Sequence, residues 1–207
     1  MQIIKYKKGS IYSLGKYNWQ ILDIQNGEAL LLSKNILEKR AYHESPGNIT
    51  WEKSTLRKYL NDEFYNKTFS TEEKKMIYET KIVNDNNPWY DTEGGSDTTD
   101  KIFLLSIEEV AEYLGVSEEF GERKGKYEEN YEAVLHGEAC YISDEYNDAR
   151  IAKTKEGEAW WWWLRSSGNY SDLAASVNHV GDLYLLGNLV HTVSIGVRPA
   201  LWIDLEY

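Results

Sequence analysis

Cysteine is almost absent from this sequence. Cys140 is the single cysteine among 207 residues, so the chain can form no internal disulfide. It stands in the segment EACYIS, which predicts a half-buried strand with Cys140 as a small core residue. The chain is long enough to bury a substantial hydrophobic core without such a bond.

Positive charge is also scarce. The chain has 23 lysines and arginines against 34 aspartates and glutamates, a formal net charge of −11. Nucleic-acid binding depends on basic side chains that neutralise phosphates, and anionic membrane surfaces attract basic segments. The charge balance therefore argues against both partners. Glutamates are concentrated in residues 108–132, which we expect to form a solvated helical face with a mobile loop.

Long apolar runs are missing as well. The N-terminal stretch MQIIKYKKGSIY has no apolar run long enough for a signal peptide, and no later segment is long enough to span a bilayer. We expect a chain without membrane insertion, either cytoplasmic or carried on a particle.

Tyrosine and tryptophan are abundant instead. There are 16 Tyr and 8 Trp against 4 Phe, a bias that suits a β-rich core and also suits half-buried binding faces. Four tryptophans stand in a row in AWWWWLRSSG, residues 159–168. In a strand Trp160 and Trp162 face one side while Trp161 and Trp163 face the other. We therefore expect both faces to be buried, and the four residues to serve the core first and a ligand second.

The first two thirds of the chain are expected to mix strands and short helices. Two β-type runs around Asn26-Gly27 predict a hairpin over residues 18–34. The expected elements that follow are a helix over 50–64 capped by Thr50 or Ser54, a helix over 70–80 with a capping box of Ser70 and Glu73, a loop over 84–100, a buried strand over 101–106, a helix over 107–115 ending at Gly115, and a polar region over 117–155.

The last third is expected to be entirely β. Short runs separated by Gly181, Gly187 and Gly196 are typical of a meander of hairpins. These runs are LAASVN, DLYLL, LVHTVS and VRPALWIDL. In the last run apolar and polar residues alternate, and Pro199 indicates an edge or a bulge because it lacks a backbone donor.

Together these elements predict one α+β domain over residues 1–207. It has an N-terminal hairpin and helices, followed by an antiparallel C-terminal sheet. The residues expected to share one core there are Trp162, Trp163, Leu164 and the strand over 197–203. Arg165 and Arg198 are interpreted as internal clamps, because a semi-buried arginine needs an acidic or carbonyl partner.

Several stretches taken together resemble a known family. They are NWQILDIQNGEALLLSKNILEKRAY, TWEKSTLRKYLNDEF, DKIFLLSIEEV, WWLRSSG and GVRPALWI, in that order. The sequence from Trp19 to Ile203 is similar to the DUF6273 family of bacterial and phage domains, whose paired WWLRS and GVRPAL motifs are specific. The resemblance implies a C-type-lectin-like fold, shared by formylglycine-generating enzymes and by variable proteins of diversity-generating retroelements.

Catalytic motifs are missing. The resemblance to formylglycine-generating enzymes implies a pair of cysteines, and only Cys140 is present. Ser166 and Ser167 lack the context of a nucleophile elbow, and no glycine-rich phosphate loop opens a helix. Zinc sites require short spacings between ligands, and these are absent among the four histidines, His43, His136, His179 and His191. We expect no enzyme and no cofactor.

The acidic residues of one loop are candidate ligands for calcium. The loop over 84–100 offers the oxygen ligands of Asp85, Asp91, Glu93, Asp97 and Asp100. Their spacing is not that of an EF-hand, and the Glu-Pro-Asn and Trp-Asn-Asp elements of sugar-binding C-type lectins are missing. We expect an ordinary polar loop without a metal.

The tail over 178–196 keeps the glycines of the family, but the residues between them are unusual. In retroelement-diversified proteins this region is rewritten at adenines, and Asn codons then become the residue types present here. We expect a non-catalytic recognition or display module that binds an unknown protein or cell-surface ligand through residues 169–195. The expected ligand-binding residues are Tyr170, His179, Val180, Asp182, Tyr184, Leu186, Leu189, His191 and Thr192.

Neighbouring residues in a strand point to opposite faces, so other tail residues must face inward. Leu183, Leu185 and Val190 are the expected core members. The alternative interpretation is an ordinary sheet in a structural or assembly domain of a surface or phage protein, with no dedicated ligand.

Overall fold

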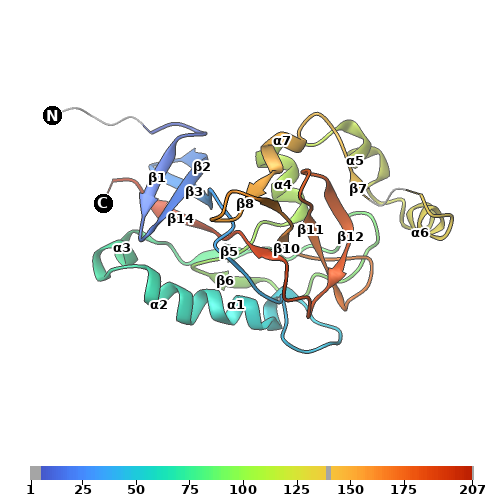
Figure 1. Cartoon of the computed structure of the whole chain (residues 1–207), viewed down its shortest axis with the longest axis horizontal. Helices are drawn as coiled ribbons and strands as arrows, with labels where there is room; N and C mark the ends of the chain where they lie inside the picture. Colours follow the sequence, from blue (N-terminus) through green and yellow to red (C-terminus); the bar gives the residue numbers. More distant parts are fainter. Residues whose placement is uncertain (1–5, 139–140, 207) are drawn as a thin grey trace.

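The computed structural model describes residues 6–138 and 141–206. Two larger β-sheets and two two-stranded sheets form the β structure, and Figure 1 shows the helices arranged around them. The architecture is α+β, as the sequence predicts. Cys140, expected in a half-buried strand, lies outside the described residues.

The first sheet contains the predicted hairpin. Its strands are β1 (Ile11–Leu14), β2 (Tyr17–Gln25), β3 (Glu28–Ser33) and β14 (Ala200–Asp204), in the order β1-β2-β3-β14. Asn26 and Gly27 have φ of 50° and 86°. Two successive positive φ angles make the turn that matches the twist of a two-residue hairpin, so this prediction is confirmed.

A helical segment follows the hairpin and runs along the bottom of Figure 1. It consists of a 3₁₀ turn η1 (Trp51–Lys53), α1 (Thr55–Tyr59), a π turn η2 (Leu60–Phe64), α2 (Tyr65–Thr68) and α3 (Thr71–Met76). Ser54 is the cap of α1, since its hydroxyl accepts a hydrogen bond from the Arg57 amide, and Ser70 with Glu73 forms the expected capping box. The predicted helix over 70–80 ends early, because Ile77 pairs with Ile203 of β14.

The middle of the chain is less regular. Strands β5 (Thr80–Ile82) and β6 (Thr98–Asp100) form a two-stranded sheet around the long loop. The predicted strand over 101–106 is wrong: Ile102 to Leu105 are buried, but in this segment only Phe103 makes a strand-like bridge, to Ala200. Helix α4 (Ile107–Leu114) ends at Gly115 as expected, with a φ of 86°.

The polar region contains short elements. They are α5 (Glu118–Arg123), α6 (Tyr127–Leu135), β7 (Tyr141–Ile142), α7 (Asn147–Arg150) and β8 (Ala152–Lys153). Figure 1 shows α5 and α6 at the outer edge, far from the first sheet. None of the helices that the structure describes is long and apolar enough to cross a membrane.

The second sheet carries most of the C-terminal third. Its strands from this part of the chain are β10 (Trp162–Ser167), β11 (Leu173–Val177), β12 (Leu183–Leu189) and β13 (Gly196–Val197). Strands β4 (Glu38–Lys39) and β7 complete the sheet at its two edges. Strand β9 (Ala159–Trp160) lies outside this sheet and pairs with β8. The order is β4-β13-β10-β11-β12-β7, and the β10–β13 pair is parallel.

Two expectations for the tail are wrong. The predicted strand LVHTVS is a turn from Val190 onward, because the chain must cross the sheet end to reach β13 beside β10. The run VRPALWIDL divides at Arg198-Pro199, so that β13 lies in the second sheet and β14 in the first. The segment expected to be one last strand therefore connects the two sheets instead of extending one meander.

One hydrophobic core includes side chains of both sheets. Trp162, Trp163 and Leu164 belong to it together with Val197, Ala200, Leu201 and Ile203, as expected. The predicted inward residues Leu183, Leu185 and Val190 are completely buried. The alternation along β12 is therefore confirmed, since Tyr184 and Leu186 between them are only half-buried.

Candidate functional site

The four consecutive tryptophans divide into two pairs. Trp162 and Trp163 are completely buried in β10, and their indole N–H groups donate to the carbonyls of Arg150 (3.0 Å) and Arg40 (2.8 Å). Trp160 and Trp161 are only half-buried. The expectation that both faces of all four are buried is wrong for this first pair.

Interruption of the strand explains the difference. Trp160 ends β9, which pairs with β8, whereas β10 begins at Trp162 and pairs with β11 and β13. Because Trp161 lies between the two strands, the strict alternation of strand side chains is lost there. Trp160 and Trp161 consequently line the same hollow, which we call the tryptophan hollow.

The tryptophan hollow is concave and open to solvent, with a volume of about 430 Å³. It combines apolar surface with neutral polar groups. Its lining residues are Ala159, Trp160, Trp161, His179, Asn188, Thr192, Ser194 and Ile195. Such a combination is typical of small-molecule sites, where a few polar groups set the orientation of the ligand.

Trp161 is held between two tail residues. Its ring meets Tyr184 of β12 edge-on, with centroids 5.7 Å apart at 87°, and lies 6.4 Å from the His179 ring. The Gly196 amide donates to the Trp161 carbonyl at 2.8 Å. Gly196 fits because a Cβ there would collide with Ile36 and with this carbonyl. The parallel β10–β13 pairing thus fixes one wall of the hollow.

Trp160 forms a second wall. Its indole N–H donates to the Ser194 carbonyl at 2.7 Å, and the Lys39 ammonium lies 3.5 Å from the centroid of its ring. Lys39 lines a different hollow, which lies beside β8 and also contains Thr154 and Glu158. Trp160 therefore separates the tryptophan hollow from a charged neighbour.

The turn between β11 and β12 brings His179 to the hollow. The side-chain oxygen of Asn178 accepts from the amides of Val180 and Asp182, and the Asn178 amide group donates to the Asp182 carboxylate at 2.8 Å. Gly181 has a φ of 89°, and a Cβ there would meet the carbonyl oxygen of Asn147. This turn is thus specified by a side-chain network and by one glycine.

Asp182 belongs to this network and not to the ligand surface. Its side chain is buried, which on its own favours the protonated acid. Hydrogen bonds from Ser143, Asn178 and Asn147, with the nearby Arg150, nevertheless lower the pKa of Asp182. The expectation that Asp182 lies on an exposed face is wrong, because its side chain is buried and its carboxylate is hydrogen-bonded within the fold.

The other eight expected residues are exposed or half-buried, but only some of them belong to the tryptophan hollow. Tyr170, His179, Val180 and Leu189 are exposed, and Tyr184, Leu186, His191 and Thr192 are half-buried. Of these, His179 and Thr192 line the hollow and Tyr184 supports it. Tyr170 instead packs on Tyr131 of α6, with ring centroids 6.3 Å apart.

The hollow also contains residues that the sequence did not single out. Asn188 lies on β12 and follows the outward-facing Tyr184 and Leu186 at the same two-residue spacing. Because side chains on one face of a strand recur every two residues, this spacing could have identified it. Ala159, Ser194 and Ile195 carry no such signal, because a turn and a strand junction place them.

The two arginines of the paired motifs are internal clamps, as expected. Arg165 donates to both carboxylate oxygens of Glu109 and to the carbonyls of Leu104 and Val83. Arg198 donates to the carbonyls of Ser33 and Arg150, and burial lowers its pKa to about 10. Neither guanidinium reaches the tryptophan hollow.

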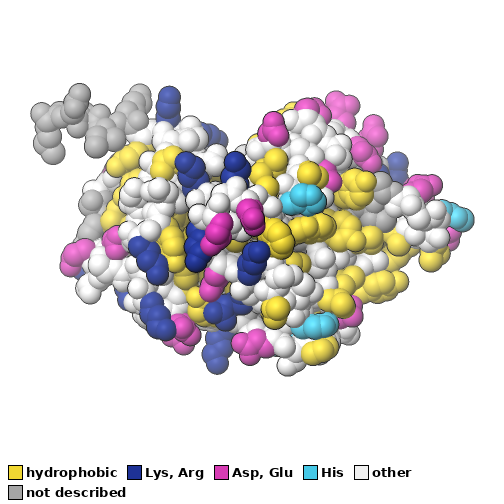
Figure 2. Space-filling view, viewed as in Figure 1, with side chains coloured by type: hydrophobic (Ala, Val, Ile, Leu, Met, Phe, Trp, Pro, Cys, Tyr) yellow, Lys and Arg dark blue, Asp and Glu magenta, His cyan; other side chains and the backbone are white. Residues whose placement is uncertain are grey.

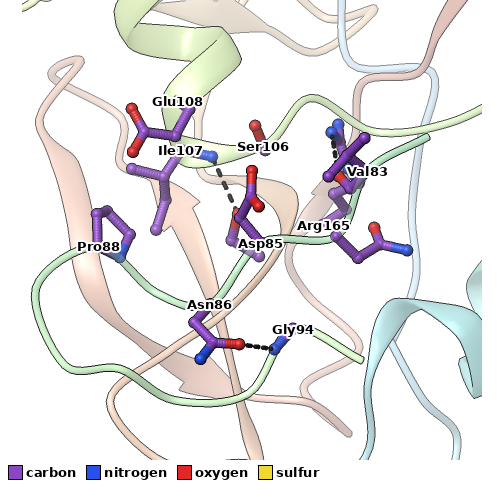
Figure 3. A pocket seen from close by; sticks show the side chains of 11 residues that line it. Val83, Asp85, Asn86, Pro88, Gly94, Ser106, Ile107, Glu108 and Arg165 are labelled. Carbon is purple, nitrogen blue, oxygen red and sulfur yellow. Dashed lines mark hydrogen bonds between the residues drawn. The ribbon is translucent and has the colours of Figure 1, made fainter. Parts of the chain in front are cut away.

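A second recess beside Arg165 is too small for a ligand. Figure 3 shows it between the loop around Asp85 and Asn86, the start of α4, and Gly94, whose amide donates to Asn86. Its volume of about 10 Å³ leaves room for about one water molecule.

The carboxylates of the 84–100 loop are partly used within the fold. Asp100 is buried and accepts from Trp51, Arg57 and Thr98, while Asp97 pairs with Lys81. Within residues 6–138 and 141–206 no cluster of three or more His, Cys, Asp or Glu side chains could hold a metal ion.

The family model of DUF6273, a domain of unknown function, matches residues 26–205. The chain belongs to the DUF6273 family. Comparisons with the curated proteins and with the solved structures found no match.

Proposed function

We propose that this chain is a non-catalytic recognition module of bacterial or phage origin. Its ligand, a protein or another cell-surface molecule, binds at the tryptophan hollow and at tail residues around it within 169–195. The observation that carries this proposal is the hollow itself. Its volume of about 430 Å³ lies within the range of about 300–1,000 Å³ typical of ligand sites, and two half-buried tryptophans form its walls.

Exposed apolar side chains in the same tail support association. Val193 is 71% exposed, and Leu189 and Val180 are 47% exposed each. Figure 2 shows a band of hydrophobic side chains over the part of the surface where β11 and β12 lie, with histidine at its border. Apolar surface that is kept exposed in one region is typical of a contact surface.

The lining of the hollow favours binding over catalysis. It contains one histidine and no carboxylate, cysteine or lysine. Acid–base or nucleophilic catalysis needs a base positioned beside a second reactive group. A single exposed imidazole beside amide and hydroxyl groups offers hydrogen bonds to a ligand instead.

Diversification of the tail is part of the proposal, together with the C-type-lectin-like framework that the motifs imply. Tyr184, Leu186 and Asn188 project from β12 on the side away from the completely buried Leu183 and Leu185. Side chains at the outward positions can change without disturbing the core. A rigid sheet with variable outward residues is what a display module requires.

Deep sequencing of the gene within one bacterial or phage population tests the diversification. We expect substitutions at adenines in the codons of outward residues such as Tyr184 and Asn188. The codons of Asn178 and Asp182 serve as the matched control, because they also contain adenines while their side chains hold the turn together, and they should stay unchanged. Substitutions spread evenly over both sets, or none in either, would contradict a diversified tail.

The alternative function, an assembly domain, is favoured by the exposure of Val193, which suits a contact between subunits. Sedimentation velocity over the micromolar range distinguishes the two. A recognition module is expected to stay monomeric. Self-association that Val193→Asp abolishes would support assembly and contradict the proposal.

A further inference from the structure

The side chains that line the tryptophan hollow are all neutral or weakly basic. Besides the indole N–H groups, four of them can form hydrogen bonds: His179, Asn188, Thr192 and Ser194. The remaining lining is mostly apolar surface, mainly the rings of Trp160 and Trp161. No Asp, Glu, Lys or Arg side chain is part of this lining.

A cationic ligand does not suit this lining. Aromatic side chains attract cations over their faces, but the Lys39 ammonium already occupies one face of Trp160, 3.5 Å from its centroid. A second cation in the hollow would be repelled by Lys39, with no carboxylate in the lining to compensate.

An anionic ligand does not suit it either. Phosphate and carboxylate groups are typically bound by arginine, lysine or several backbone N–H groups at a helix start. The hollow lies among strands and turns and has none of these side chains, and the chain carries a net charge of −11. The lining therefore favours a neutral ligand.

The hydrogen-bonding groups decide between neutral ligands. The hydroxyls of Thr192 and Ser194 can each donate and accept. The Asn188 amide donates to Ser176 Oγ at 2.8 Å, which uses one of its two N–H groups and leaves the other and the carbonyl oxygen for a ligand. An apolar side chain from a partner protein would remove these groups from water without pairing them, which weakens binding for each group left unpaired.

We propose that the tryptophan hollow binds a saccharide ring. One face of such a ring presents C–H groups that pack on the Trp161 indole, and its edge presents hydroxyls that pair with Asn188, Thr192, Ser194 and His179. Because these groups are neutral protein side chains, binding needs no metal ion. The inference rests on the proposed recognition function and names the ligand chemistry of the same site.

Titration calorimetry of the whole chain tests the proposal, with methyl glycosides of glucose, galactose, mannose and N-acetylglucosamine as probes. N-acetyltryptophanamide serves as a probe for an aromatic protein side chain. We expect at least one glycoside to bind with a dissociation constant in the millimolar range, as one ring with few hydrogen bonds allows. Adding a metal chelator should leave this affinity unchanged.

Variants locate the binding. Trp161→Ala should weaken the glycoside affinity at least about tenfold, equivalent to about 1.4 kcal/mol, and Asn188→Ala should weaken it severalfold. Trp202→Ala is the matched control, because Trp202 is also half-buried but belongs to β14 of the first sheet. It should leave the affinity unchanged.

Each contrary outcome has a separate meaning. If no glycoside binds, or if chelation abolishes binding, the saccharide proposal is overturned. Binding of N-acetyltryptophanamide alone, lost in Trp161→Ala, also overturns it but leaves the recognition function in place with a protein partner. If neither kind of probe binds the wild-type chain, both the saccharide ring and the recognition site in this hollow are refuted.

Discussion

Two adjacent pairs of identical residues have opposite environments in this protein. Trp162 and Trp163 are completely buried, whereas Trp160 and Trp161 are half-buried and form the walls of an open hollow. All six residues of β10 are buried, so both faces of that strand are covered. The environment changes from the wall of the hollow at Trp161 to the buried core at Trp162, where β9 gives way to β10.

Strand pairing, and not residue type, decides whether each tryptophan is buried or lines the hollow. Trp162 and Trp163 pair with Val177 and Ser176 of β11 inside a six-stranded sheet. Trp160 pairs with Ala152 in a separate two-stranded hairpin. Where the two sheets fail to continue into each other, aromatic surface stays available to a ligand.

The largest expected effect is on the buried pair. Trp163→Ala should lower the free energy of unfolding by about 3–5 kcal/mol, because it removes a completely buried aromatic side chain and leaves a cavity. The Trp163 ring also meets Tyr42 edge-on at 5.9 Å. Urea denaturation followed by circular dichroism measures the loss. A decrease of less than about 1 kcal/mol would mean that this side chain is not in a packed core.

The turn that carries His179 to the hollow should be sensitive to its glycine. Gly181→Ala is expected to lower stability by about 1–3 kcal/mol, since a Cβ there is strained by the positive φ and meets the Asn147 carbonyl. Gly157→Ala is the matched control, because Gly157 has a φ of 90° with no atom within 4 Å of its Cβ position. Equal losses in the two variants, measured by thermal unfolding, would show that the contact with Asn147 contributes nothing.

The same turn should respond to acid. Hydrogen bonds hold the pKa of Asp182 below its ordinary value of 3.8 in the fold, so the unfolded chain takes up this proton at a higher pH. The stability that Asp182 contributes is therefore complete above its unfolded pKa and is lost as the pH falls through the folded one. Asp182→Asn should destabilise the protein more at pH values near neutrality than in strong acid. A difference that grows toward acid would contradict this sign.

Much of the local structure could be predicted from the sequence, because local chemistry determines it. Asn26-Gly27 specified its turn, Ser54 and Ser70 their helix starts, and the alternation in β12 its buried Leu183 and Leu185. Each of these depends on residues close together in the chain. Arg165 and Arg198 could be interpreted as internal clamps for a different reason: a buried guanidinium needs partners, although here these partners lie far away in the sequence.

The hollow could not be predicted, because distant segments build it. The end of β9 is set by its pairing with β8, and the turn after Leu189 is set by the parallel placement of β13 beside β10. The apolar run LVHTVS is compatible with a strand, yet Val190 is buried and Val193 is 71% exposed because the chain turns there. Long-range pairing therefore overrides the local pattern at the site itself.

The Trp161 side chain should contribute little to the stability of the fold. Urea denaturation of Trp161→Ala should give a free energy of unfolding within about 1 kcal/mol of wild type, because a half-buried indole at the edge of a hollow loses few contacts. This result, beside the large loss in Trp163→Ala, would show that the Trp161 indole is dispensable for the fold and free to bind. A loss of about 3 kcal/mol or more in Trp161→Ala would place Trp161 in the core with Trp162 and Trp163, and the hollow would lose its role as a binding site.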